Sequence, residues 1–153
     1  MTYPLQYFRL AIGDTDNNIS ANGSSLSPSP LTGKPTEKWY VNFISANVFQ
    51  IANASNNKLI TASGNNVVLA NNSNSESQKW KIEGVDKDYE GFFLYYKITS
   101  NSDSSKSLTY IANEGFSLAK YSGINYQKFK LNLDGLEGFA ANCKTSSGEK
   151  AGT

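Results

Sequence analysis

The sequence predicts a single all-β domain built from three copies of one unit, because three short markers recur in the same order along its 153 residues. The first marker is an aromatic–polar–aliphatic segment at residues 8–11, 49–52 and 96–99. The second places a serine or threonine after an aliphatic residue, at residues 19–21, 60–62 and 108–110. The third ends on Trp39, Trp80 and Phe129, which lie 31, 31 and 33 residues after Phe8, Phe49 and Tyr96. Three markers with nearly constant spacing indicate an internal threefold repeat.

Each unit is predicted to contain about four short strands. Side chains alternate between apolar and polar around residues 7–12, 80–83 and 128–131, which is the period of a β-strand. Asn- and Asp-rich segments at 13–17 and 53–57 separate such stretches, and these residues favour turns because they tolerate positive φ. No stretch shows a helical apolar stripe. We therefore expect twelve strands in repeats of about 5–44, 45–89 and 90–134.

A β-trefoil is the packing that suits this arrangement. One 40-residue unit cannot bury its apolar face alone, and three units are too few for a propeller. Three hairpin-rich units can close around one core, which removes exposed sheet edges. Trp39, Trp80 and Phe129 are then expected to be equivalent core residues, and residues 1–134 to form the trefoil.

Composition excludes several classes of function. The chain has no histidine and one cysteine, which removes histidine-based catalysis, cysteine-rich zinc sites and an intrachain disulfide. Its formal net charge of +1 argues against a nucleic-acid binder. Asp14, Asp16 and Asn18 resemble the start of a calcium loop, but Ile19 stands where a glycine is required. We expect no cofactor, no metal site and no catalytic residues.

The segments Glu37-Lys38-Trp39, Gln78-Lys79-Trp80 and Gln127-Lys128-Phe129 resemble the Gln-x-Trp signature of ricin-type β-trefoil lectins and carbohydrate-binding modules. Only the second repeat matches in full. The resemblance implies sugar binding in shallow pockets, up to one per repeat, often in modules attached to secreted polysaccharide-degrading enzymes.

The C-terminal residues 135–153 form a predicted linker or the start of a following domain. Residues 138–151 resemble the beginning of a bacterial pectate lyase catalytic domain, although the likeness covers only a short segment. That resemblance implies an accessory module at the N-terminal side of a pectin-degrading enzyme. We expect a domain taken from a longer secreted protein.

The resemblance also implies where sugar should bind, and the residues it requires are missing. The family uses an Asp early in the second strand and an aromatic platform in the third. The matching residues are Ser20, Thr61 and Thr109 for the Asp, and Ser29, Ala70 and Ala119 for the platform. Pro28 and Pro30 further predict an irregular third strand in the first repeat.

The remaining candidate ligand residues lie mainly in the third repeat. They are Lys120, Tyr121, Asn125, Gln127 and Thr109, with Asn71 and Asn72 from the second repeat. Tyr121 could stack on a sugar ring and Lys120 could pair with a uronate carboxylate, or Tyr121 and Tyr126 could instead pack over their loop.

We therefore expect a monomeric, secreted, non-catalytic module that binds a polysaccharide or oligosaccharide of plant cell walls, with pectin as the favoured polymer. Its partner would be a catalytic domain in the parent chain, with no nucleic acid or membrane involved. Two alternatives stay open. The trefoil could be a structural or protein-interaction domain that has lost sugar binding, or a docking domain for an adjacent pectate lyase catalytic domain.

Overall fold

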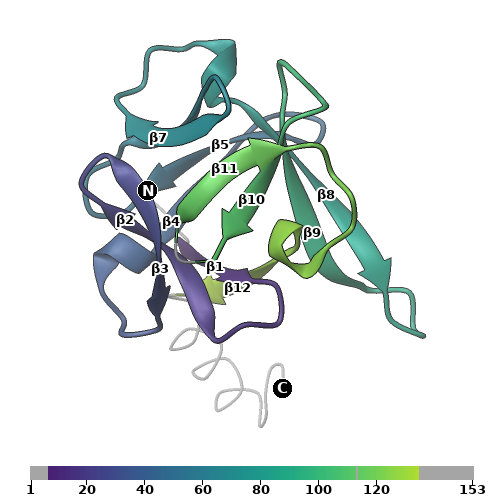
Figure 1. Ribbon diagram of the computed structural model, residues 1–153. Helices are drawn as coiled ribbons and strands as arrows, with labels where there is room; N and C mark the ends of the chain where they lie inside the picture. The colour runs from purple at the N-terminus through teal and green to yellow at the C-terminus, as the bar shows by residue number, and fades with distance from the viewer. Residues whose placement is uncertain (1–6, 113, 135–153) are drawn as a thin grey trace, which may run out of the picture.

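The computed structural model describes residues 7–112 and 114–134, and these form a β-trefoil (Figure 1). The expected C-terminal segment 135–153, with its pectate lyase likeness, lies outside the described residues. Six strands pair in a closed ring in the order β12–β1–β4–β5–β8–β9 and back to β12. The strands of this ring are β1 (Tyr7–Ile12), β4 (Trp39–Ser45), β5 (Val48–Asn53), β8 (Trp80–Lys87), β9 (Phe93–Ser100) and β12 (Phe129–Asp134).

Three hairpins cover one end of the ring, one from each repeat. Their strands are β2 (Asn17–Asn22) with β3 (Ser25–Pro30), β6 (Leu59–Ser63) with β7 (Asn66–Ala70), and β10 (Ser107–Ile111) with β11 (Gly115–Ala119). The hairpins also bond to each other, since the Leu69 amide donates to the Ser24 carbonyl and the Leu118 amide to the Asn65 carbonyl. The twelve strands predicted from the repeat are therefore present.

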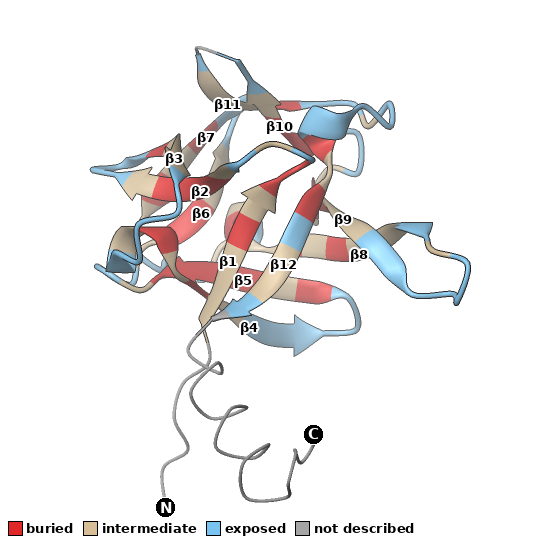
Figure 2. Ribbon diagram, turned by 90° about the horizontal axis from the view of Figure 1, so that it is seen from below, coloured by how far each residue is buried: buried red, intermediate tan, exposed pale blue. Residues whose placement is uncertain are grey.

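The repeat marks equivalent positions in space. The first-strand aromatics pair with the third-marker residues in one register: Phe8 with Trp39, Phe49 with Trp80, and Tyr96 with Phe129. Trp39, Trp80 and Phe129 are each 0% exposed, which confirms their prediction as core residues. Figure 2 shows the buried residues concentrated in the strand centres, with exposed residues at the hairpin tips.

Three one-turn 3₁₀ helices precede these aromatic residues, and the sequence did not predict them. They are η1 (Pro35–Glu37), η2 (Glu76–Gln78) and η3 (Asn125–Gln127). A single turn is too short to show a helical period, which is why sequence pattern misses it. Each turn carries its repeat's Glu or Gln inward, at the end of the loop that connects the third strand of the repeat to the fourth.

The predicted irregularity of the first repeat's third strand is wrong. β3 pairs with β2 over six consecutive positions, from Asn17 opposite Pro30 to Asn22 opposite Ser25. β3 stands at the end of the described sheet order, where a strand can lack a ladder donor without breaking a central pairing.

The β8–β9 hairpin extends well beyond the ring (Figure 1). Its strands stay paired from Trp80 opposite Ser100 to Lys87 opposite Phe93. Tyr89 at its tip is 98% exposed. The acidic stretch around residues 86–90 thus forms the end of a paired arm.

Candidate functional site

A buried glutamine holds the loop that precedes the last strand in the second and third repeats. The side-chain oxygen Oε1 of Gln127 accepts a hydrogen bond from the Ser122 backbone amide at 2.7 Å. Its Nε2 donates to the Lys120 carbonyl at 2.9 Å and to Thr109 Oγ1 at 3.1 Å. In the second repeat, Gln78 makes the same set of bonds with the equivalent residues, which are Ser73, Asn71 and Thr61. We call this set of contacts the brace.

The first repeat builds its brace with a carboxylate. Glu37 is 1% exposed and accepts the amides of Thr32 at 2.8 Å and Gly33 at 3.0 Å, together with the Thr32 hydroxyl. A carboxylate cannot donate to the second strand, and Ser20 there donates to the Thr36 carbonyl instead. Burial raises the pKa of Glu37, but the hydrogen bonds from Thr32 and Gly33 and the charge of Lys34 outweigh it and lower the pKa below its ordinary value.

Two of the candidate ligand residues serve this brace. Thr109 is 6% and Gln127 1% exposed, and they bond to each other. Their side chains position the loop of the third repeat and leave ligand contact to exposed neighbours.

The site expectation assumes that the residues aligned with the family's Asp are equivalent in the three repeats, and the strand pairing bears on this assumption. Ser20, Thr61 and Thr109 occupy equivalent positions in β2, β6 and β10. No carboxylate stands at any of the three. The expectation that the family's Asp is missing from all three repeats stays a prediction, and the structure shows only that these three residues are equivalent to one another.

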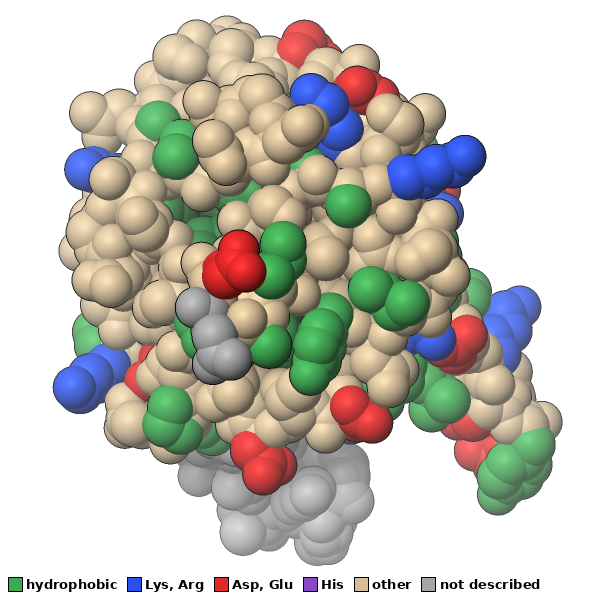
Figure 3. All heavy atoms as spheres, in the orientation of Figure 1, with side chains coloured by type: hydrophobic (Ala, Val, Ile, Leu, Met, Phe, Trp, Pro, Cys, Tyr) green, Lys and Arg blue, Asp and Glu red, His purple; other side chains and the backbone are tan. Residues whose placement is uncertain are grey.

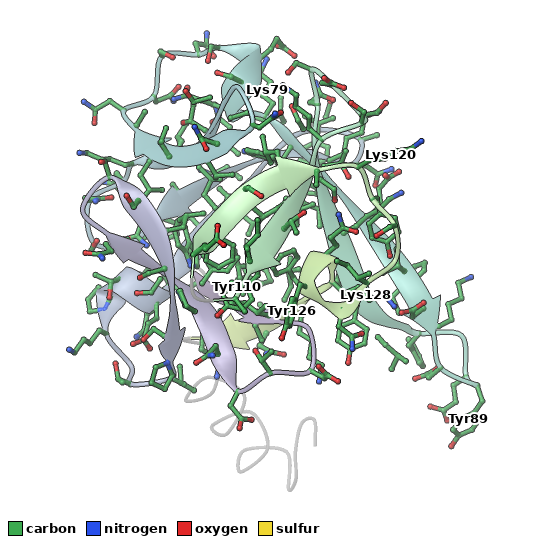
Figure 4. The ribbon with its side chains drawn as sticks, viewed as in Figure 1. Lys79, Tyr89, Tyr110, Lys120, Tyr126 and Lys128 are labelled. Atoms are coloured by element: carbon green, nitrogen blue, oxygen red, sulfur yellow. The ribbon has the colours of Figure 1, made fainter. Side chains whose placement is uncertain are left out.

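The exposed candidates of the third repeat lie around Tyr121. Tyr121 is half-buried, and Lys97 Nζ of β9 lies 5.0 Å from its ring centroid. Lys120 is exposed and lies on the outer side of the molecule in Figure 4. Asn125 is exposed and its Nδ2 lies 3.5 Å from Asp14 Oδ2. Tyr126 instead packs edge-on against Tyr110 of β10, with ring centroids 5.2 Å apart.

Tyr121 belongs to a larger surface of alternating rings and ammonium groups, which we call the lysine–tyrosine wall. Its members are Tyr95, Lys97, Tyr121, Lys128 and Lys130. Lys130 Nζ lies 5.5 Å from the Tyr95 ring centroid. Lys128 Nζ forms an ion pair with Asp86 of β8. This hydrogen bond to Asp86 is the main reason why the pKa of Lys128 lies above its ordinary value, and the nearby Tyr121 and Tyr95 contribute in the same direction.

Strand pairing creates this wall. Phe129 of β12 faces Tyr96 of β9, and both point into the core side of the ring. The residues next to them in each strand therefore point outward and lie side by side. Sequence reasoning found the alternation in each strand but missed Tyr95, Lys97 and Lys130 as site residues, because the pairing joins segments about 33 residues apart. Within the described residues, no ion pair involves Lys97 or Lys130.

The second repeat's candidates act as turn residues. Asn71 and Asn72 are exposed. The Asn72 side-chain oxygen accepts the Asn74 amide at 2.8 Å, and the Asn71 carbonyl accepts Gln78. The structure does not bring these two residues near the lysine–tyrosine wall, which belongs to strands β9 and β12 and the third repeat's loop.

In the part of the chain that the structure describes, no three His, Cys, Asp or Glu side chains gather to hold a metal ion. No helix among the described residues is both long and apolar enough to cross a membrane.

Comparisons with known proteins support the architecture. No family model matches the chain, and no curated protein matches it by sequence. The structure is similar to BEL β-trefoil, at 12% identity, a TM-score of 0.69 and coverage of 88% of this chain and 97% of that one. An exo-β-1,3-galactanase from Clostridium thermocellum gives 14% identity and a TM-score of 0.73, over 88% of this chain and 31% of the enzyme.

A Polyporus squamosus lectin, solved with a human-type influenza-binding epitope, gives 12% identity and a TM-score of 0.65, over 85% of this chain and 50% of the lectin. The chain thus spans about a third of the galactanase and half of the lectin. At these identities the shared feature is the β-trefoil fold.

Proposed function

We propose that the protein is a non-catalytic carbohydrate-binding module whose lysine–tyrosine wall binds an acidic plant cell-wall polysaccharide of the pectic type. The observation that carries the proposal is the stacking of Lys97 on Tyr121 beside the stacking of Lys130 on Tyr95. Aromatic rings pack against the apolar faces of sugars, and ammonium groups form charge-assisted bonds to carboxylates. A polymer of uronate units offers both partners at regular intervals.

The charge of the wall supports an acidic ligand. Asp86 neutralises Lys128, and Glu83 lies opposite Lys97 across the β8–β9 ladder. Lys130 is exposed, and with Lys97 and Lys120 it leaves the wall and its loop with positive charge. The surface is open, so each sugar contact is weak and several must act together along one chain.

The likeness to a galactanase of which this chain covers about a third supports a role as one domain of a larger secreted enzyme. In that role the module would hold the catalytic domain near its polymer and raise its effective concentration.

Affinity electrophoresis through gels that contain polygalacturonate, its methyl-esterified form, xylan or galactan tests this proposal. A chelator in every gel excludes calcium-linked polymer networks. We expect retardation by polygalacturonate, weaker retardation by the methyl ester, and loss of retardation as salt increases.

Variants locate the site. Tyr121→Ala and the double variant with Lys97→Gln and Lys130→Gln should each abolish retardation. Tyr89→Ala and Lys58→Gln remove the same groups from the arm tip and from the second repeat, so they are matched controls that should bind normally. Unfolding curves confirm that each variant is folded. Absence of retardation by any polymer, or retardation unchanged in both wall variants, would refute the proposal.

A second candidate function rests on the β8–β9 arm. Tyr89, Phe92 and Leu94 are 98%, 68% and 48% exposed, which is unusual for a hairpin tip with no partner. This surface favours a docking role toward another protein domain. If the polymers fail to bind and Phe92→Asp increases the solubility of the folded chain, the docking function becomes the better description.

A further inference from the structure

A pocket of about 430 Å³ lies between two hairpins that belong to different repeats. Asn22, Leu26 and Ser27 line it from the β2–β3 hairpin, and Tyr110 and Glu114 line it from the β10–β11 hairpin. The pocket is open to solvent, so a ligand here would be only partly enclosed, although the volume itself is of the size that small-molecule sites have. It lies between repeats one and three. The sugar pockets that the resemblance to ricin-type lectins implies would each lie within one repeat.

Tyr110 gives this pocket a fixed aromatic ring. Its ring centroid lies 5.3 Å from that of Phe116 and 5.2 Å from that of Tyr126, which meets it edge-on. Figure 4 shows Tyr110 and Tyr126 side by side, with Lys120 farther away at the edge of the molecule. A ring that is already held in place loses little freedom when a ligand stacks on it.

The polar groups of the pocket are available to a ligand. Among the described residues, no hydrogen bond uses the side chain of Asn22 or Glu114 or the hydroxyl of Tyr110. Asn22 and Glu114 are both exposed. A carboxylate, an amide and hydroxyl groups thus surround one ring, and together they offer donors as well as acceptors.

The charge of the pocket differs from that of the lysine–tyrosine wall. Its lining contains Glu114 and no lysine or arginine. In Figure 3, one acidic side chain lies near the centre of this face, other acidic side chains lie at its margins, and the basic side chains lie toward the margins. A uronate would be repelled here, and a neutral ligand would not.

We propose that this pocket binds one neutral hexopyranose unit. Tyr110 serves as the platform for the apolar face of the sugar, and Glu114 and Asn22 bond to its hydroxyl groups. An ammonium ion can donate to Glu114 and lie over the ring, but it cannot accept a hydrogen bond from the Asn22 amide group. A sugar hydroxyl can both donate and accept, so a sugar can bond to all of these groups. The inference rests on the contacts of the pocket and is independent of the wall.

Two-dimensional ¹H–¹⁵N NMR of the whole chain tests the proposal. The probes are the methyl glycosides of glucose, galactose and mannose, together with N-acetylglucosamine, galacturonate and ethanolamine, each added separately. At least one neutral sugar should shift the amide signals of Asn22, Ser27, Glu114 and Gly115. Galacturonate and ethanolamine should leave them unchanged.

Substitutions separate a specific site from a general effect. Asn22→Trp fills the pocket and should abolish the shifts. Ser63→Trp places the same side chain at the equivalent position of β6, outside the pocket, and should leave binding unchanged. Glu114→Gln keeps the shape but removes the charge, and should weaken binding about tenfold. Tyr121→Ala, which tests the wall, should have no effect here.

Three results would overturn the inference. They are the absence of a shift with every neutral sugar, equal binding in Asn22→Trp and the unmodified chain, or binding of ethanolamine in place of the sugars. Because the wall is assayed with polygalacturonate and the pocket with neutral monosaccharides, either proposal can fail while the other stands.

Discussion

Replacing Glu37 with Gln should destabilise the first repeat, although the same glutamine serves the other two. The Glu37 carboxylate accepts two backbone amides and the Thr32 hydroxyl while 1% exposed. Bonds to a charged acceptor contribute about 1 kcal/mol more each than bonds to a neutral one. Gln keeps one oxygen acceptor and loses the charge, so we expect the free energy of unfolding at pH 7 to fall by about 1–3 kcal/mol.

A second substitution, at Ser20 in β2, should restore part of the stability that Glu37→Gln loses. Gln78 and Gln127 donate to Thr61 and Thr109, whose hydroxyls donate in turn to a carbonyl two residues earlier in the same strand. The Ser20 hydroxyl of the first repeat donates to the Thr36 carbonyl instead, so its lone pairs are oriented differently. The double variant Ser20→Thr with Glu37→Gln recreates the brace of the other repeats and should recover about 1 kcal/mol. Ser20→Thr alone should change stability little, because the native Glu37 has no proton to donate to it.

Urea unfolding of the four proteins measures the coupling, and pH supplies an independent check. The folded-state pKa of Glu37 is lowered, so its stabilising effect is complete above the unfolded pKa of about 4.3 and is lost as pH falls through the folded pKa. The stability difference between the native chain and Glu37→Gln should therefore shrink in acid. Equal stability of both proteins at pH 7, or an equal effect of Ser20→Thr in both backgrounds, would refute the brace argument.

Three further changes have definite expected outcomes. Trp80→Phe removes an indole donor to a strand carbonyl and should cost about 2–4 kcal/mol in urea unfolding; a loss below about 0.5 kcal/mol would contradict its role. Gly13→Ala should cost about 1–3 kcal/mol by the same assay, because φ is +50° and the new methyl group would meet the Asn125 carbonyl oxygen at 2.5 Å; unchanged stability would argue against this contact. Asp86→Asn should lower the pKa of Lys128 in NMR titrations and increase retardation by polygalacturonate, and an unchanged pKa would show that the ion pair is not formed in solution.

The sequence predicted those features that depend on local pattern. Alternation gave the strands, and the recurrence of Trp39, Trp80 and Phe129 identified three core residues that are fully buried. The third marker also singled out Gln127, whose side chain holds the preceding loop by hydrogen bonds to Thr109 and to the Lys120 carbonyl.

Features that depend on pairing between distant segments could not be predicted. The wall exists because Phe129 faces Tyr96, a register that no local pattern of lysines and tyrosines specifies. The hairpin pocket joins Asn22 to Glu114, which lie in different repeats. Pro28 was misleading for a related reason, because the effect of a proline depends on whether its strand stands at a sheet edge, and that is a property of the whole fold.

The braces have a consequence for how this architecture can be diversified. Gln78 and Gln127 secure their loops through main-chain groups at fixed separations, and each adds a hydroxyl from Ser73 or Ser122. The other side chains of the two loops differ, with asparagine at 72 and tyrosine at 121. A loop held in this way can change its other side chains without losing the hydrogen bonds that attach it. The loop of one repeat can therefore acquire side chains that bind a different ligand. The brace of that repeat and the structure of the other two repeats would stay the same.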